Sequence, residues 1–175
     1  MLTHILGDHF NPATLLRLAR ERPTLRFACC TWLCAPLVDA GVKANQIDAI
    51  RTDRWYTYKG LCRIKAQETK HDVQNCCWHI ELQQHPIDRL FYATDTNNLN
   101  GIKTKGYSLY LVEANYEEAD IQDRIAEKKI NGEFVYEKRV MREHLSKEKA
   151  DDWLYSNMAA NSEYVYMHCH QEKEN

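Results

Sequence analysis

The chain has 175 residues, a formal net charge of −2 at pH 7, and contains 44% hydrophobic and 27% charged residues. These values are typical of one globular domain with a core of its own. They exclude a strongly basic protein, although net charge does not describe local clefts, and no apolar run approaches the roughly 20 residues that a membrane-spanning helix needs.

The N-terminus lacks the basic start and the long apolar stretch of a signal peptide. The seven cysteines include the adjacent pairs Cys29/Cys30 and Cys76/Cys77, without a C-x-x-C motif or the spacing of a disulfide framework. This pattern favours reduced, mostly buried thiols and predicts a cytoplasmic protein that does not associate with membranes. A zinc site made of cysteines is the less favoured alternative.

The predicted elements begin with a helix. Asn11 is a typical N-cap and Pro12 a typical first helical residue, and the helix should end near Pro23. A strand is expected at residues 25–30, then a short helix from about residue 35 to 40 with a C-terminal stop at Gly41. The strand-like segments that follow are residues 47–51, Trp55–Tyr58, 61–66, 73–82, 89–94 and 108–113.

Helical patterns cover residues 117–129 and 147–159, the second with Ser146 as N-cap, and Glu163–Met167 is a final strand. Strands mixed with helices predict a layered α/β (α+β) architecture. We expect a single domain at residues 1–170 and a polar tail at 171–175.

The aromatic segment Trp55–Tyr58, followed by Lys59, allows two interpretations. The favoured one is a β-strand with one packed face. The alternative is a surface whose rings stack on nucleic-acid bases.

Histidines and aspartates gather where predicted strands end. They are His4, Asp8, His9, His71, Asp95 and His168. An α/β protein places its functional residues at such strand ends. Imidazole and carboxylate groups together suit zinc, iron or manganese, so the set predicts a metal site.

Each of these residues also has a simpler interpretation. Asp8 could cap the following helix, Asp95 could begin a turn, and His168 could be a surface residue near the C-terminus. No single residue outweighs these alternatives, and the ordered set is what supports a metal site.

Residues 3–9 (THILGDH) resemble the Thr-His-x-His-x-Asp-His signature of metallo-β-lactamase-fold hydrolases. Later segments resemble, in the same order, those that carry this family's other ligands: 70–73 (KHDV), 91–96 (FYATDT) and 165–168 (VYMH). Residues 111–116 (LVEANY) and 139–146 (RVMREHLS) resemble its nuclease and phosphodiesterase branch. The resemblance runs from Thr3 to about His170, and its first motif is the most specific.

The resemblance implies an αββα sandwich that binds one or two Zn²⁺ ions, with Mn²⁺ or Fe²⁺ as alternatives. It assigns one ion to His4, His71 and Asp95, and the second to Asp8, His9, Asp95 and His168. A hydroxide between the metals would attack a phosphorus or carbonyl centre. Asp8 and His144 are the predicted catalytic residues: His144 would donate to a phosphate oxygen or protonate a leaving group. The alternative for His144 is a helix-entry residue beside Ser146.

The chain departs from the family pattern in two ways. Leu6 stands where the signature has its second histidine, so the first site keeps three ligands and should be weaker. The motif also follows directly after Met1, whereas family members carry further strands before it. We therefore expect the sandwich to lack the first strands of one sheet, and its exposed edge to allow self-association.

The leading hypothesis is a metal-dependent hydrolase of phosphodiester or nucleic-acid substrates. The second is a catalytically impaired or inactive descendant that binds a partner or nucleic acid through the former active-site cleft. The third is a structural α/β domain with incidental histidines. The substrate, the metal and its occupancy, the oligomeric state and the completeness of the chain stay open at this point.

Overall fold

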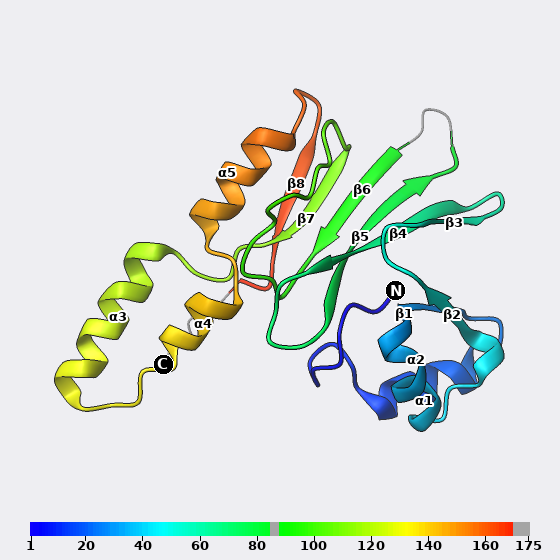
Figure 1. Ribbon diagram of the computed structural model, residues 1–175, viewed down its shortest axis with the longest axis horizontal. Coiled ribbons are helices and arrows are strands. Elements are labelled where there is room, and N and C mark those ends of the chain that lie inside the picture. Colours follow the sequence, from blue (N-terminus) through cyan, green and yellow to red (C-terminus); the bar gives the residue numbers. More distant parts are fainter. Residues whose placement is uncertain (85–87, 170–175) are drawn as a thin grey trace.

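A computed structural model describes residues 1–84 and 88–169, which form five α-helices and eight strands in two sheets (Figure 1). His170 and the tail predicted for 171–175 lie outside the described residues. Within the described ranges, no helix has both the length and the apolar character needed to cross a membrane.

The larger sheet has the strand order β3-β4-β5-β6-β7-β8 over the described residues. Its strands are antiparallel from β3 to β6 and parallel from β6 to β8. They span Trp55–Tyr58 (β3), Cys62–Thr69 (β4), Asn75–Leu82 (β5), Asp88–Ala93 (β6), Leu109–Glu113 (β7) and Glu163–Met167 (β8).

The smaller sheet pairs β1 (Phe27–Cys30) with β2 (Ile47–Ile50) in parallel. Leu2 lies alongside β1: its amide donates to the carbonyl oxygen of Ala28 at 3.0 Å, and it forms an isolated bridge with Cys29. The stretch that leads into the predicted metal motif is therefore anchored to a buried strand.

The helices are α1 (Pro12–Glu21), α2 (Cys34–Asp39), α3 (Glu118–Asn131), α4 (Glu137–Glu143) and α5 (Lys147–Asn157). The predicted caps of α1 and α5 are confirmed: the side chain of Asn11 accepts from the amide of Thr14, and that of Ser146 from the amide of Lys149. The sequence did not predict α4, because this short helix is mostly charged and shows little apolar periodicity.

The smaller sheet is packed on both faces. Phe27 and Cys29 of β1 lie in a buried cluster with α1 and α2. Their neighbours Ala28 and Cys30 point the other way, into a cluster with Trp78 and other residues of the larger sheet. Because successive side chains of a strand alternate between its faces, the adjacent cysteines pack on opposite faces of the smaller sheet.

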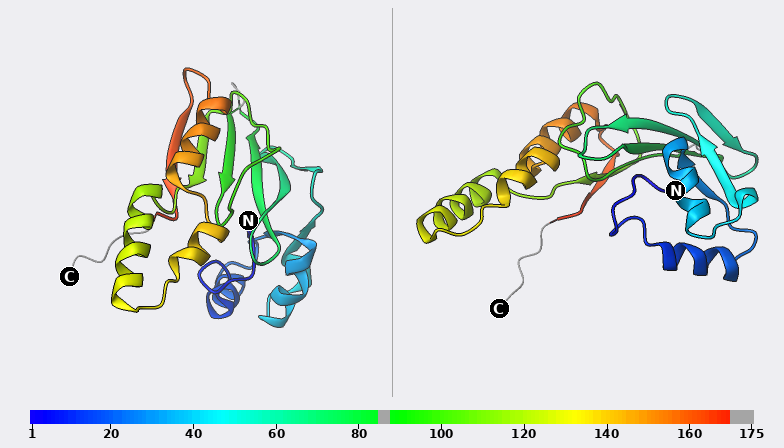
Figure 2. Two further views of the ribbon diagram at one scale, coloured as in Figure 1. Left: turned by 60° about the vertical axis from the view of Figure 1, so that its left-hand side comes forward. Right: turned by 60° about the horizontal axis from the view of Figure 1, so that its bottom comes forward.

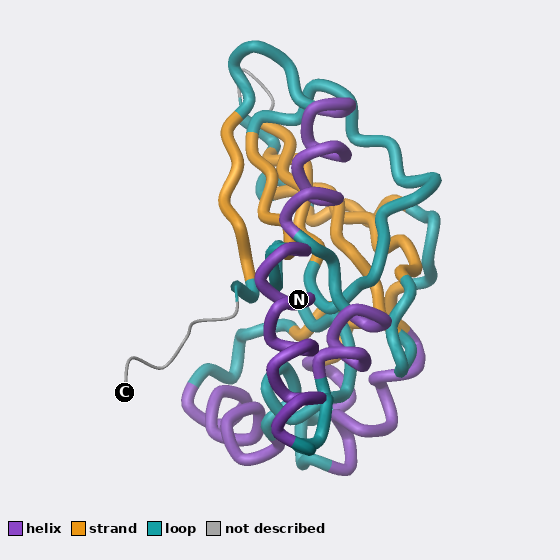
Figure 3. The backbone as a smooth tube through the Cα atoms, turned by 90° about the vertical axis from the view of Figure 1, so that its left-hand side faces the viewer, coloured by secondary structure: helices purple, strands orange, loops and turns teal. Residues whose placement is uncertain are grey.

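The larger sheet shows the same division. Cys76 and Trp78 of β5 face the smaller sheet, whereas Cys77 joins Phe91 in a cluster with α5. The layers thus run α1/α2, smaller sheet, larger sheet, α5, which is the predicted αββα sandwich (Figures 1 and 2). Seen from the side of α3 and α5, these helices lie in front of the strands (Figure 3).

The aromatic segment is a strand with one packed face, as favoured. Tyr56 and Tyr58 pack between the two sheets. Trp55 points to the opposite face of the larger sheet, where the Arg63 guanidinium lies 4.8 Å from its ring centroid. All seven cysteines lie within the described residues and are free thiols.

Candidate metal centre

The predicted donors gather at one edge of the larger sheet because the chain ends several strands there. Asp95 follows β6, His168 follows β8, and His71 lies in the turn between β4 and β5. Antiparallel pairing brings the end of β4 and the start of β5 to the edge at which the parallel strands end. His4 and His9 reach the same place from the segment after Leu2.

One donor group consists of Asp8, His9, Asp95 and His168, whose ligand atoms all lie within 4.8 Å of one another. Nε2 of His9 lies 3.0 Å from Oδ2 of Asp95, and Nδ1 of His168 lies 3.3 Å from its Oδ1. The side chain of Asp8 is 58% exposed, so this group opens to solvent on the Asp8 side. Asp8 does not cap α1, since Asn11 does.

A second group consists of His4, His71 and Asp95, again with ligand atoms within 4.8 Å of one another. Nδ1 of His4 hydrogen bonds with the Thr3 hydroxyl at 3.0 Å, and Nδ1 of His71 donates to the Glu143 carbonyl oxygen at 3.3 Å. Such bonds hold the ring and leave the other nitrogen for a metal.

The remaining nitrogens of this second group fit a cation. Nε2 of His4 and Nε2 of His71 are buried without a hydrogen-bond partner among the described residues. Nε2 of His71 lies 3.1 Å from a carboxylate oxygen of Asp72, but without the geometry of a hydrogen bond. Since buried polar atoms are almost always paired, two orphaned imidazole nitrogens close to a carboxylate are the arrangement that a metal would complete.

Asp95 belongs to both groups and is tightly held. Its backbone adopts a left-handed conformation (φ 53°), and its side chain is almost fully buried. Nδ2 of Asn75 donates to the carbonyl oxygens of Thr94 at 2.9 Å and of Asp95 at 2.6 Å. The Thr94 hydroxyl donates to Oδ2 of Asp95 at 2.8 Å. Asp95 therefore does more than begin a turn, the simpler interpretation, because its carboxylate is buried and held among the donors.

The charges of the site are set by burial and by these contacts. Burial raises the pKa of Asp95, but the hydrogen bond from His9 and the nearby His168 outweigh it and hold the pKa far below the usual range. Burial lowers the pKa of His4 to about 4, so its imidazole is neutral at neutral pH, as a metal ligand must be. The hydrogen bond to Asp95 raises the pKa of His9.

Glu113 is a residue of this site that the sequence did not predict. It is fully buried at the end of β7, and its Oε1 accepts from Nδ1 of His144 at 2.6 Å and of His168 at 3.0 Å. Its Oε2 accepts from the amide of Thr96 at 2.8 Å. Glu113, Asp95, His144 and His168 form a further group with ligand atoms within 4.8 Å. The available signal was an acid ending an apolar strand, as with Asp95.

Four of the predicted donors, Asp8, His71, Asp95 and His168, line a cavity of about 320 Å³. Leu6 forms part of its wall and offers no donor atom, so the position that departs from the signature does face the site. Arg139 lies at the same cavity, bonded to Asp72 at 2.7 Å and to Glu143 at 2.7 Å. The cavity therefore has one guanidinium group, paired with two carboxylates, beside its imidazoles and carboxylates.

No protein-family model matches the chain, and no curated protein matches its sequence. Several solved structures are similar to the chain. The chain is 15% identical to human tRNase Z, short form (TM-score 0.65), covering 97% of this chain and 71% of that one. It is 15% identical to the metallo-β-lactamase fold protein YhfI from Bacillus subtilis (TM-score 0.66), covering 98% of this chain. It is 17% identical to Zn²⁺-bound PqqB from Methylobacterium extorquens (TM-score 0.51), covering 67% of this chain.

The chain spans 64% of the length of YhfI and 46% of that of PqqB, so it corresponds to part of each of these two proteins. At these identities the similarity concerns the arrangement of the backbone. Together with the layer order and the strand topology, it shows that this chain has the metallo-β-lactamase fold.

Proposed function

We propose that the protein is a metal-dependent hydrolase of phosphodiesters, with nucleic acid as the substrate class. The observation that carries the proposal is the pair of donor groups that share the buried carboxylate of Asp95. Two adjacent groups of imidazole and carboxylate donors, opening into one cavity, are suited to a pair of divalent ions.

In this proposal His4, His71 and Asp95 hold one ion, and Asp8, His9, Asp95 and His168 hold the other. Zinc suits this donor set best, with Mn²⁺ and Fe²⁺ as alternatives. When bound, such ions lower the pKa of a water molecule and neutralise the charge of the attacked phosphate.

The residues around the ions have separate tasks. Asp8, the most exposed member of the second donor group, also orients the attacking water and accepts its proton. His144 donates Nδ1–H to Glu113, which fixes the ring and leaves Nε2 to protonate the leaving oxygen or to donate to a phosphate oxygen. Arg139 at the cavity rim binds a non-bridging phosphate oxygen.

Three observations support the proposed substrate class and the proposed cellular location. The guanidinium of Arg139 lies at the cavity, where it could meet an anionic ester. A solved structure of similar fold is that of a tRNase Z. The free cysteines favour a reducing compartment, and we infer a cytoplasmic location.

We also propose that copies of the chain associate through an edge of the smaller sheet. Sedimentation velocity tests this proposal.

The central experiment measures metal content by elemental analysis in protein purified without added metal, and cleavage of bis-p-nitrophenyl phosphate. We expect bound zinc, manganese or iron, and loss of both metal and cleavage in His9→Ala and Asp95→Ala. The matched control is His79→Gln, which changes a histidine outside the cluster and should keep both. Equal activity in the wild type, His9→Ala and Asp95→Ala would refute the proposal.

A second candidate function rests on Leu6. Because this side chain lines the cavity without offering a donor, the group of His4, His71 and Asp95 is short of one ligand. A chain that binds nucleic acid or a protein partner through this cavity without turnover is the alternative. Less than one equivalent of metal, together with no cleavage, would favour it.

A further inference from the structure

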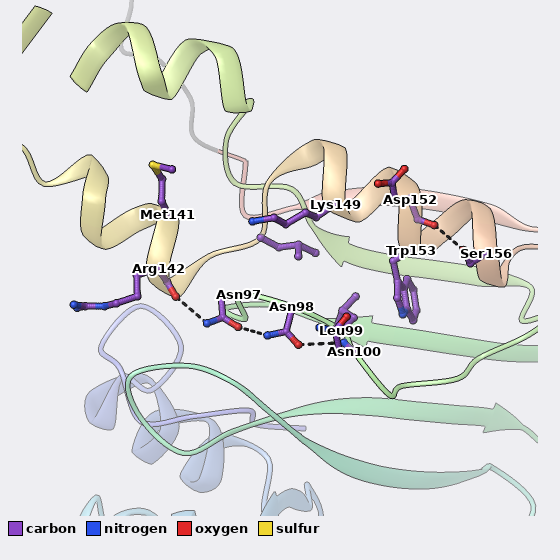
Figure 4. Close-up of a pocket in the computed structure, with 11 residues that line it drawn as sticks. Asn97, Asn98, Leu99, Asn100, Met141, Arg142, Lys149, Asp152, Trp153 and Ser156 are labelled. Carbon is purple, nitrogen blue, oxygen red and sulfur yellow. Dashed lines mark hydrogen bonds between the residues drawn. The ribbon is translucent and has the colours of Figure 1, made fainter. Parts of the chain in front are cut away.

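A second and larger cavity is also lined by residues of α4. Its volume is about 750 Å³, within the roughly 300–1,000 Å³ of sites that bind small molecules. The residues around it that carry the inference are Asn97, Asn98, Asn100, Arg142, Lys149 and Trp153 (Figure 4).

The two cavities are built from the same stretches of chain. Asn97 follows Asp95 by two residues, and Arg142 precedes His144 by two. The side-chain amide of Asn97 donates to the carbonyl oxygen of Arg142 at 2.9 Å, which ties the loop after β6 to α4. Whatever occupies the second cavity therefore lies beside the metal centre.

Helix α4 presents a cation to each cavity. Arg139 lies at the metal centre, and Arg142, three residues later, lies at the second cavity. Arg142 donates to Glu143 through Nη2 at 2.8 Å, and its side chain is 73% exposed, so its other nitrogens are accessible. Lys149 adds a second exposed cation, with a loose 3.8 Å pair to Glu118. Two exposed cations at a cavity that shares α4 with a hydrolytic centre suit a backbone phosphate of a bound strand.

The rest of the cavity suits a nucleobase. The asparagine side chains lie between Arg142 and Trp153, joined by hydrogen bonds from Asn98 to Asn97 and from the amide of Asn100 to Asn98 (Figure 4). Trp153 is fixed by Phe91, at a ring distance of 5.0 Å, and is only partly buried. Amide groups pair with base edges, and an anchored indole offers a surface for stacking.

We propose that this cavity is the subsite for the nucleotide adjacent to the scissile phosphodiester, an inference that rests on the function proposed above. Arg142 and Lys149 contact the backbone phosphate of that nucleotide, and its base lies against Trp153 and the asparagine amides. Because the base must leave its stack to enter, the substrate is single-stranded at this position.

The test compares binding of a fluorescently labelled, phosphorothioate-linked single-stranded hexanucleotide by anisotropy over a range of salt concentrations. Lys149→Ala should weaken binding by about tenfold at low salt and reduce the slope of log affinity against log salt by about 0.7, the value for one phosphate contact with a single strand. Asn98→Ala should weaken binding with the slope unchanged. The backbone amide of Lys149 keeps its bond to Ser146 in the variant, so α5 keeps its cap.

Lys43→Ala is the matched control, because Lys43 is an exposed lysine near the smaller sheet. It should keep both the affinity and the slope. Bis-p-nitrophenyl phosphate contains no nucleotide that could occupy this cavity, so its cleavage should be the same in Lys149→Ala as in the wild type. In contrast, kcat/KM for a hexanucleotide should fall by about the same factor as its affinity.

The experiments distinguish failure of the proposed hydrolase function from failure of the proposed nucleotide subsite. If the wild type cleaves neither substrate, the hydrolase function falls, and the binding difference between the wild type and Lys149→Ala still decides the subsite. Equal hexanucleotide affinity and slope in the wild type, Lys149→Ala and Asn98→Ala would overturn the subsite, as would no binding by the wild type.

Discussion

Asn75 holds the backbone of Asp95: its side-chain Nδ2 donates to the carbonyl oxygen of Asp95 at 2.6 Å, across the edge where β5 starts and β6 ends. The same nitrogen reaches the carbonyl oxygen of Thr94 at 2.9 Å. Because Asp95 has a positive φ, a conformation that few residues other than glycine adopt, this fully buried amide keeps the shared carboxylate in place.

Replacing Asn75 with alanine should therefore loosen the metal centre. We expect Asn75→Ala to lose about 2–4 kcal/mol of unfolding free energy, since two buried carbonyl groups lose their donor. Metal affinity should fall by about 10- to 100-fold, the usual effect of losing a residue that orients a ligand. Urea unfolding and the absorption spectrum of the Co²⁺-substituted protein measure the two effects. Asn131→Ala, at the exposed end of α3, is the control, and an unchanged Co²⁺ spectrum in Asn75→Ala would contradict the prediction.

The position of Leu6 predicts two unequal metal sites. The group with four donors, which includes Asp8 and His9, should bind its ion more tightly than the group of His4, His71 and Asp95. Leu6→His should raise the weaker affinity by at least about tenfold, or about 1.4 kcal/mol. Isothermal titration with zinc resolves the two steps. Leu61→His, at an exposed leucine, should leave both affinities as in the wild type, and two equal steps in the wild type would count against the prediction.

The contact between Glu113 and His144 predicts a dependence on the leaving group. If His144 protonates the leaving oxygen, His144→Ala should slow cleavage of a dinucleotide, whose alkoxide is a poor leaving group, by about 100-fold or more. Cleavage of bis-p-nitrophenyl phosphate should fall much less, because nitrophenolate leaves without a proton. Glu113→Gln should act in the same direction, since it weakens the support of His144. Equal losses on both substrates would assign His144 to another role.

His79 predicts a pH dependence of stability. Its ring is buried between Tyr107 and Gln67, and burial lowers its pKa to about 3. As the pH falls below about 6.5, His79 binds a proton in the unfolded chain but stays neutral in the folded chain. This group therefore lowers the unfolding free energy as the pH falls from about 6.5 toward 3. From pH 8 to pH 5 its contribution is about 2 kcal/mol.

The variant His79→Gln removes this titration. Urea unfolding of the wild type and of His79→Gln at pH 8 and pH 5 should show a loss of stability that is smaller in the variant by about 2 kcal/mol. The compared quantity is the change in unfolding free energy between pH 8 and pH 5 in each protein. The pH-independent effect of the substitution and the titration of the carboxylates, which both proteins share, cancel in this comparison. Identical pH dependence in the two proteins would contradict the assigned protonation state.

Much of the local structure was predictable because its signals lie close together in the chain. Asn11 beside Pro12 defines the start of α1, and the apolar pattern of Glu163–Met167 defines β8. The sequence did not predict the short helix Glu137–Glu143, because its mostly charged residues form no periodic apolar face.

The amino-acid sequence by itself determined the order of the candidate donors and the kinds of atom that they offer, because residue type and spacing from a strand end are properties of the chain. Only the tertiary structure decided that Glu113 meets His144, which lies 31 residues away, that Asn75 holds Asp95, and that Leu6 faces the cavity. Such contacts depend on strand register and on the packing of layers, and these are set by the burial of the whole core, which no local pattern encodes.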